Sequence, residues 1–274
     1  MNVAVPANYA ERLDRLAVGF EPVDAVRGGR YPHPLRFEIE PAALDLDATA
    51  AYRRSWREGQ ARPIVDRHDS CRYALLYQPR LEPGTVNLRI DDPTRRAVPR
   101  RFRLPIPSLA AAEAAPAGHR VRRPVVFPGA AFELSGRVTG LRARVTRGGA
   151  PLRWARIEAR LPGSNRLVGR AHGDDRGEFL LVLEPSAAPL AELTDPLSVR
   201  VIAHGPAVAP VPPTGVLADP LWDLPLELLP APGAPDPVSS GETLPASYVA
   251  TGTSTRLVDF RLGRLVSAPD FVFS

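Results

Sequence analysis

A stretch of alternating apolar and polar residues from Phe132 to Leu183 constrains the fold more than any other part of the chain. Successive side chains of a β-strand point to opposite faces, so an alternation with period two indicates a strand with one buried face. The stretch contains two such runs, at residues 132–138 and 155–161, and a continuous apolar run at 178–183. We therefore predict an antiparallel β unit of three strands joined by turns.

Glycine-containing turns separate these runs. Arg147–Pro151 holds two glycines, which supply positive φ, and a proline, which ends strand pairing. Asp174–Gly177 combines carboxylates that accept local backbone hydrogen bonds with a glycine that tolerates the left-handed region. The order of a glycine-containing strand, a GGAP turn, the strand WARIEA and the turn DDRGEF resembles the carboxypeptidase regulatory-like, or prealbumin-like, β-sandwich. This resemblance implies a fold and says little about function, because such sandwiches serve many roles.

A related pattern occurs nearer the N-terminus. VRGGRYPHPLRFEIE, beginning at Val26, echoes VTRGGAPLRWARIEA, beginning at Val145, in its turn, its Pro-Leu-Arg and its alternating strand. Further alternating runs at residues 71–77, 85–90 and 101–106 would complete the first unit. We predict an all-β protein with two β-sandwich modules, the first Ig-like and the second prealbumin-like.

Composition and turn residues suggest how the chain is divided. The 32 prolines favour short strands and extended segments over long helices. Near residues 44–60 the β pattern is interrupted by a short insertion, in which Asp47 could cap a helix that places Tyr52 and Trp56 on one face. We predict an N-terminal Ig-like sandwich at residues 13–106 and a linker at 107–129. A carboxypeptidase regulatory-like sandwich follows at 130–204, and a proline-rich strap with a docking tail at 205–274.

The charge of the chain does not indicate nucleic-acid binding. The net charge is +5, but every one of the 35 basic residues is arginine, and 30 acidic residues are interspersed with them. No long basic block is available to follow a phosphate backbone. The N-terminus lacks an apolar segment of signal-peptide length, and no apolar run is long enough to span a membrane. We expect synthesis and assembly in the cytoplasm, with release as part of a larger particle as an option.

Residues that could carry chemistry are scattered. The single cysteine, Cys71, lies in a strand-like run and is expected to be a small buried side chain. For Asp174 and Asp175, a hairpin turn explains the pair better than a calcium site. On a strand, His68, Asp69 and Ser70 would point to alternate faces and form no relay. We predict no catalytic residue, no cofactor and no metal, because the five histidines are placed in separate turns or linkers: His33, His68, His119, His172 and His204.

Trp154 is the side chain that folding explains least. The alternation places it on the polar face of its strand, where a bare indole would be unusual. Three explanations are consistent with this: the indole is covered by the strap at residues 216–230, by a partner protein, or by a sugar ring stacked on it. The aromatic residues of the tail should also dock, because they are costly to leave in water. The predicted protein-interaction residues are Trp154, Arg156, Glu158, Arg160, Trp222, Phe260, Phe271 and Phe273.

These observations favour a non-enzymatic structural protein that binds other protein subunits. The layout of two modules and an extended tail, ending in GRLVSAPDFVFS, resembles accessory structural proteins of phage-tail-like contractile injection systems. This resemblance implies a cap, baseplate or adaptor component. The alternative is a carbohydrate or cell-wall binding module, and a third option is an accessory domain of a hydrolase.

Overall fold

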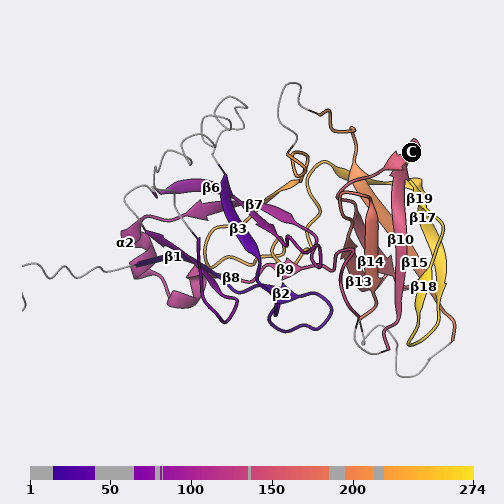
Figure 1. Cartoon of the computed structure of the whole chain (residues 1–274), viewed down its shortest axis with the longest axis horizontal. Helices are drawn as coiled ribbons and strands as arrows, with labels where there is room; N and C mark the ends of the chain where they lie inside the picture. Colours follow the sequence, from indigo (N-terminus) through magenta and orange to yellow (C-terminus); the bar gives the residue numbers. More distant parts are fainter. Residues whose placement is uncertain are drawn as a thin grey trace, which may run out of the picture.

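The structure is a computed structural model in which strands dominate, as the all-β prediction requires (Figure 1). It describes residues 15–40, 65–77, 81, 83–134, 137–184, 195–212 and 219–274. The short helix predicted near residues 44–60 lies outside these ranges. Among the described residues no helix is both long and apolar enough to cross a membrane.

Two sheets enclose the first hydrophobic core. One contains, in spatial order, β4 (Val65–Arg67), β5 (Tyr73–Tyr77), β1 (Arg15–Phe20) and β8 (Val121–Arg122). The other contains β16 (Leu226–Leu228), β7 (Arg100–Ile106), β6 (Gly84–Asp91) and β3 (Arg36–Glu40). The apolar side chains between these sheets form one cluster, which includes Phe20, Leu75, Leu88 and Phe102.

Two further sheets enclose the second core. In the first, β10 (Gly140–Arg147) lies between β11 (Ala150–Pro151) and β14 (Glu178–Val182) and also pairs with β18 (Leu265–Ser267) and β19 (Phe271–Val272). In the second, the order is β13 (Leu167–His172), β12 (Arg156–Arg160), β15 (Leu197–Pro206) and β17 (Tyr248–Phe260). Leu141, Leu181, Ile157 and Val201 are among the fully buried side chains of this core.

Alternation predicted several strands correctly. On β7, Phe102, Leu104 and Ile106 point into the first core, and on β12 the apolar residues Ile157 and Ala159 point into the second. The alternating strand of each sequence echo is formed, as β3 and β12. In the first half β1 pairs with β5 and β3 with β6; in the second half β10 pairs with β14 and β12 with β15, all antiparallel.

The turn at Asp174–Gly177 is formed as predicted. Oδ1 of Asp174 accepts hydrogen bonds from the backbone N–H groups of Arg176 and Glu178, at 2.8 and 3.0 Å. Gly177 has a φ of +72°, and a Cβ at this position would lie 2.4 Å from the carbonyl oxygen of Val145. Only glycine meets both demands, so the turn chemistry read from the sequence has a structural basis.

Two local predictions in this region are wrong. The first strand of the opening stretch was placed at 132–138, whereas the strand occupies Gly140–Arg147. The backbone of residues 129–131 instead bonds to the turn of the first half, with the N–H groups of Gly129 and Ala131 donating to the carbonyls of Arg96 and Arg95. The strand β13 was not predicted at all. Its apolar residues are separated by Gly169 and Arg170, which weakens the alternation.

Cys71 also differs from the prediction. It lies in a turn before β5 with a φ of +56° and is only partly buried. Its Sγ lies 3.7 Å from the carbonyl oxygen of Pro32, so it contacts the neighbouring loop and does not belong to the strand face.

The predicted linker at 107–129 is largely structured, which corrects the prediction. It contains α2 (Leu109–Ala114), the 3-10 helix η1 (Ala117–Arg120), β8 and β9 (Val125–Val126). β8 pairs in parallel with β1, and β9 pairs in parallel with β2 (Val23–Asp24). The alanine run forms a helix capped by Ser108, whose Oγ accepts from the N–H of Ala111 at 3.2 Å.

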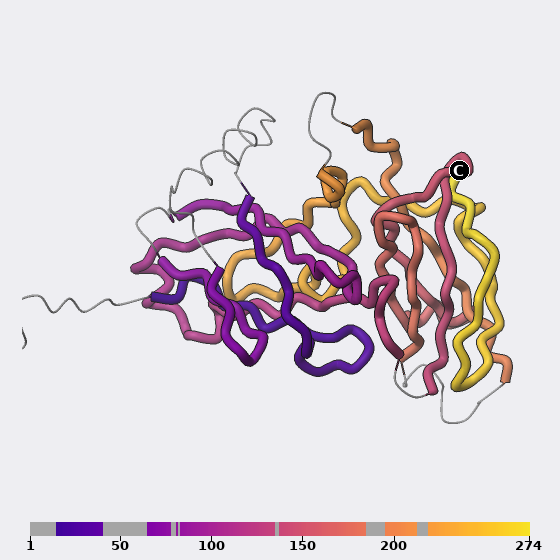
Figure 2. Tube along the Cα trace, in the orientation of Figure 1, coloured from indigo at the N-terminus to yellow at the C-terminus, as the bar shows by residue number. Residues whose placement is uncertain are grey.

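The last part of the chain contributes strands to both halves of the structure. After β15 it crosses to the first core, where β16 pairs in parallel with β7, and then returns, so that β17 pairs with β15 (Figure 2). The final strands β18 and β19 both pair with β10. Phe271 and Phe273 are buried in the second core, so the tail docks on its own chain.

Candidate functional site

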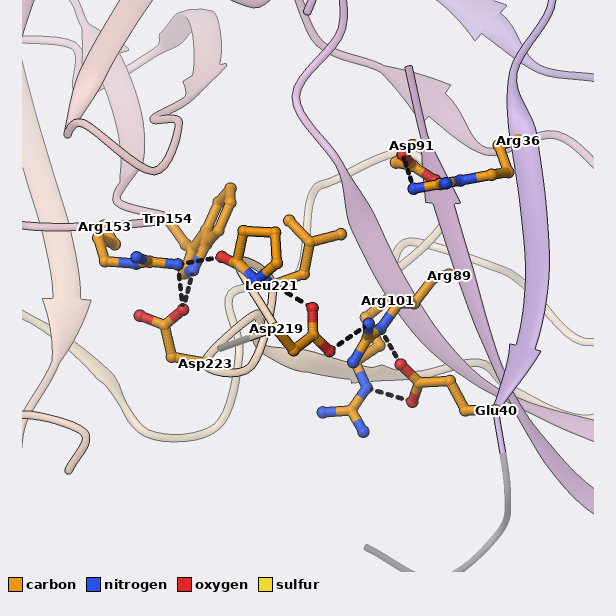
Figure 3. A network of polar contacts seen from close by, with 11 residues as sticks. Arg36, Glu40, Arg89, Asp91, Arg101, Arg153, Trp154, Asp219, Leu221 and Asp223 are labelled. Atoms are coloured by element: carbon orange, nitrogen blue, oxygen red, sulfur yellow. Dashed lines mark hydrogen bonds and ion pairs between the residues drawn. The ribbon is translucent and has the colours of Figure 1, made fainter. Parts of the chain in front are cut away.

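Trp154 lies between the two cores, packed against side chains from both halves of the chain. Its backbone has a φ of +60° just before β12, which turns the side chain away from the face predicted by alternation. The indole is 2% exposed and packs with Val98, Leu221 and Leu224. Its Nε1–H donates to Oδ1 of Asp223 at 2.7 Å (Figure 3). The prediction of an outward-facing tryptophan is therefore wrong, and the segment at 219–224 provides part of its covering.

Ion pairs continue from Trp154 into the first half of the chain. Arg153 contacts Asp223 at 2.8 Å and donates to the carbonyl of Pro220, while Asp219 accepts from Arg89 at 2.6 Å (Figure 3). Further along, Arg89 and Arg101 both contact the carboxylate of Glu40, at the end of β3. Burial, and secondarily the nearby Arg89, lowers the pKa of Arg101 to about 10. The segment 219–224 is thus connected to both halves of the chain by charged groups.

A second, deeper group of charges lies nearby. Arg100 on β7 and Arg156 on β12 both donate to Glu227 on β16, through Nη2 to Oε2 at 2.5 Å and Nη2 to Oε1 at 3.2 Å, respectively. All three side chains are at most 4% exposed. Two strands from different cores therefore share one carboxylate from a third segment. We call these three residues the buried triad.

Backbone carbonyls complete the hydrogen bonding of the buried triad. Arg100 also donates to the carbonyls of Val125, Val238 and Ser239, at 3.0, 2.5 and 2.7 Å. Arg156 donates to the carbonyl of Trp154 at 2.9 Å. A buried charge is tolerated when it is paired and hydrogen-bonded, and this arrangement satisfies both conditions. Segments far apart in sequence are consequently held at one point.

His172, at the end of β13, is packed beside the buried triad. Its ring stacks on Phe127 with centroids 3.7 Å apart, and its Nδ1 has no hydrogen-bond partner within the described part of the chain. Burial lowers the pKa of His172 well below its usual range, and the neighbouring Arg156, Arg100 and Arg170 lower it further. The imidazole is therefore neutral in the folded protein.

This neutral histidine should make stability sensitive to acid. Below its usual pKa of about 6.5, the unfolded chain binds a proton at His172 that the folded chain does not. The stability present above pH 6.5 should therefore fall as pH decreases, by up to about 1.4 kcal/mol per pH unit from this residue. Urea unfolding from pH 8 to pH 5 should show a steeper loss for the native sequence than for His172→Phe, which keeps the aromatic stack. Equal slopes would contradict a buried neutral imidazole.

The other predicted interaction residues are distributed differently from expectation. Arg156 is buried in the triad, and Phe260, Phe271 and Phe273 are buried in the second core. The burial of Arg156 corrects its predicted place on the polar face of its strand, whereas the buried phenylalanines agree with the expectation that the aromatic tail docks. Trp222 is partly buried, with Arg153 6.0 Å from its ring centroid.

Glu158 and Arg160 remain on the outer face of β12. They contact each other at 3.0 Å, and Nε2 of His204 lies 3.5 Å from Glu158. His204, with help from Arg160, lowers the pKa of Glu158 to about 2. Both His172 and His204 lie on strands, not in the turns or linkers predicted for them.

Exposed apolar side chains follow the last strands of the chain, and the sequence prediction missed them. Leu257 on β17 is 62% exposed and Val272 on β19 is 50% exposed. The group, which we call the C-terminal edge, consists of Val249, Leu257, Leu262, Leu265 and Val272. β17 is the outermost strand of its sheet, and no described strand pairs with its outer edge. The sequence did contain a signal for this exposed group, because Leu257 occupies a position where the alternation requires a polar residue.

A cleft with carboxylate groups opens beside Trp154. It has a volume of about 240 Å³ and is lined by residues of both halves, including Asp91, Asp92, Asp174 and Asp175. Burial raises the pKa of Asp174, while the hydrogen bonds from Arg176 and Glu178 oppose that change. Among the described residues, no three His, Cys, Asp or Glu side chains are grouped so as to hold a metal ion.

His68 and Ser70 contact each other. Nδ1 of His68 lies 2.8 Å from Oγ of Ser70 and accepts from its backbone N–H at 3.1 Å. These residues form a turn after β4, which brings the two side chains together. The contact accounts for the local turn geometry.

No family model, curated protein or solved structure matches this chain.

Proposed function

We propose that this chain is a structural assembly protein composed of two β-sandwich modules, which binds other subunits of a larger particle through its C-terminal edge. The first module is Ig-like and the second resembles the carboxypeptidase regulatory-like sandwich. The proline-rich strap joins them. The similarity in layout and tail sequence to accessory proteins of phage-tail-like contractile particles suggests a cap, baseplate or adaptor position.

The exposed C-terminal edge is the observation that carries this proposal. Natural proteins usually protect an outermost strand with charges, bulges or a covering segment, because its free backbone groups can pair with another chain. β17 has an irregularity in its pairing with β15 near Ile202, and Leu257, opposite Arg200, lies exposed on the outer face of the sheet. Apolar side chains along such an edge favour contact with another protein.

The connections between the cores support a rigid subunit. The buried triad and the ion pairs around Trp154 join the first core, the second core and the segment that crosses between them. A subunit that transmits or resists force in a particle needs such fixed geometry. The carbohydrate alternative depended on an outward Trp154, and the burial of this indole removes that support.

The experiment compares two leucines of equal exposure. Leu257, on the C-terminal edge, and Leu228, on β16, are each 62% exposed. The tagged chain and its Leu257→Arg and Leu228→Arg variants would replace the native copy in the source cells. The fraction of each that sediments with large particles would then be measured. We expect the native chain and Leu228→Arg to sediment with particles, and Leu257→Arg to be lost from them by at least about tenfold.

Two results would contradict the proposal. The native chain could remain entirely in the fraction of small proteins, or Leu257→Arg could sediment with particles as well as Leu228→Arg does. Urea unfolding of both variants would confirm that each is folded. Substitutions at such exposed positions usually change stability by less than about 0.5 kcal/mol.

A further inference from the structure

The cleft beside Trp154 has the composition of a binding site for a positively charged group. Its walls are formed by the indole of Trp154, by Leu221 and Pro220 of the crossing segment, and by Gly129 and Ala130. Binding sites commonly combine apolar walls with a few converging polar groups. At about 240 Å³ the cleft is smaller than most pockets for small molecules, and it suits one side chain.

The charges lining the cleft do not balance. Four carboxylates line it, Asp91, Asp92, Asp174 and Asp175, against two guanidinium groups, Arg36 and Arg95. Four negative charges less two positive charges leave a local charge of −2, in a chain whose net charge is +5. The cleft therefore attracts cations although the protein as a whole does not.

Most of these carboxylates already have close partners. Asp91 forms two hydrogen bonds with Arg36, at 2.9 and 2.8 Å. Asp92 accepts from the backbone N–H and the hydroxyl of Thr94, and from the hydroxyl of Tyr31 at 3.2 Å. Asp175 is paired with Arg95. These three groups are satisfied within the chain.

Asp174 is different. Its side chain is 7% exposed, and no residue that the structure describes donates a hydrogen bond to its Oδ2. Nη2 of Arg95 forms an ion pair with Oδ2 at 3.8 Å, which is beyond hydrogen-bond distance, and the side chain of Arg95 is 44% exposed. A buried carboxylate oxygen without a donor is costly, so a donor that reached it would be bound favourably. Arg95 is exposed enough to move aside.

We propose that this cleft receives the guanidinium or ammonium group of a basic side chain from a partner protein, with Oδ2 of Asp174 as its acceptor and Trp154 beside its aliphatic part. This inference rests on the proposed assembly function and names the chemistry of one partner contact. The arginine and lysine side chains combine an apolar stem with a terminal donor, which matches the apolar walls and the deep acceptor.

The experiment uses three amino-acid derivatives on the full chain. N-acetyl-arginine amide and N-acetyl-lysine amide carry the cation, and N-acetyl-citrulline amide has the shape of the arginine compound without its charge. Amide NMR signals of Arg176 and Glu178, whose N–H groups bond to Asp174, would report binding. We expect saturable shifts with at least one cationic compound and none with the citrulline compound.

Variants locate the contact. Asp174→Asn keeps an oxygen acceptor for the turn and removes the charge, and it should weaken binding by at least about tenfold. Asp270→Asn is the control, because Asp270 is an exposed carboxylate paired with Arg144 away from this cleft. It should bind as the native chain does. Arg95→Ala removes the competing guanidinium and should strengthen binding by up to about fivefold.

The outcomes separate this inference from the proposed function. Absence of saturable shifts, equal binding of the citrulline compound, or unchanged binding by Asp174→Asn would overturn it, even if the chain sediments with particles. Binding of free agmatine more than tenfold tighter than acetyl-arginine amide would identify a small-molecule site and also overturn it. Binding as expected by a chain that never sediments with particles would leave the cleft in place and contradict the assembly function.

Discussion

Phe271→Ala should destabilise the protein by about 3–5 kcal/mol, although this residue is only three positions from Ser274. The ring is fully buried in the second core and lies edge-on to Phe179, with centroids 5.8 Å apart. Arg256 lies over it, 4.8 Å from the centroid. Truncation would remove the buried ring and leave a cavity between the two sheets. Urea unfolding monitored by circular dichroism would measure the loss.

Val272 provides the control, because it occupies the same strand and is 50% exposed. Val272→Ala should change the free energy of unfolding by less than about 1 kcal/mol. If Phe271→Ala is no more destabilising than Val272→Ala, the tail does not form part of the second core.

Glu227→Gln should have an effect of comparable size. The substitution preserves the shape of the side chain but leaves Arg100 and Arg156 buried without a counter-charge. Removing one partner of a buried ion pair costs about 3–5 kcal/mol, because the remaining charge is uncompensated. The expected loss does not mean that the buried triad is more stabilising than an apolar core would be, since desolvation offsets much of the attraction.

Glu242→Gln is the matched control for this substitution. Glu242 is 52% exposed and lies 4.0 Å from Arg170. An exposed pair of this kind contributes about 0–1 kcal/mol. Similar unfolding curves for Glu227→Gln and Glu242→Gln would show that the buried triad does not connect the segments as the structure indicates.

The sequence was informative where strands follow a simple alternation. On β6, β7 and β12 the apolar residues alternate without a break, and the structure buries them except for Val86, which is partly buried. The turn at Asp174–Gly177 was also predictable, because both its carboxylate and its glycine have a chemical role in the turn. The docking of the aromatic tail followed from the cost of exposing Phe271 and Phe273, and the structure shows that docking on the same chain.

Alternation failed where the backbone or a distant partner decides which way a side chain points. The positive φ of Trp154 turns its side chain away from the predicted face, and single-residue alternation contains no information about φ. Arg100 and Arg156 are buried because Glu227 meets them from a segment remote in sequence. No local pattern predicts this contact, and Arg156 was assigned to the polar face of its strand.

The linker was mispredicted for a related reason. β8 and β9 have two residues each, which is too short to show any alternation. Their positions are fixed by parallel pairing with β1 and β2, which are separated from them by about a hundred residues. Only the tertiary structure reveals that residues 121–126 belong to the first half of the chain.

Site-specific photo-crosslinking in intact particles tests the central claim most directly. A photo-reactive amino acid would replace Leu257 on the C-terminal edge or Leu228 on β16, in cells that assemble the particle. The assembly account predicts that position 257 forms crosslinks to one other particle subunit, identified by mass spectrometry, and that position 228 forms far fewer. Crosslinks of equal yield at the two positions, or none at position 257 in particles that contain the chain, would contradict an interface at the C-terminal edge.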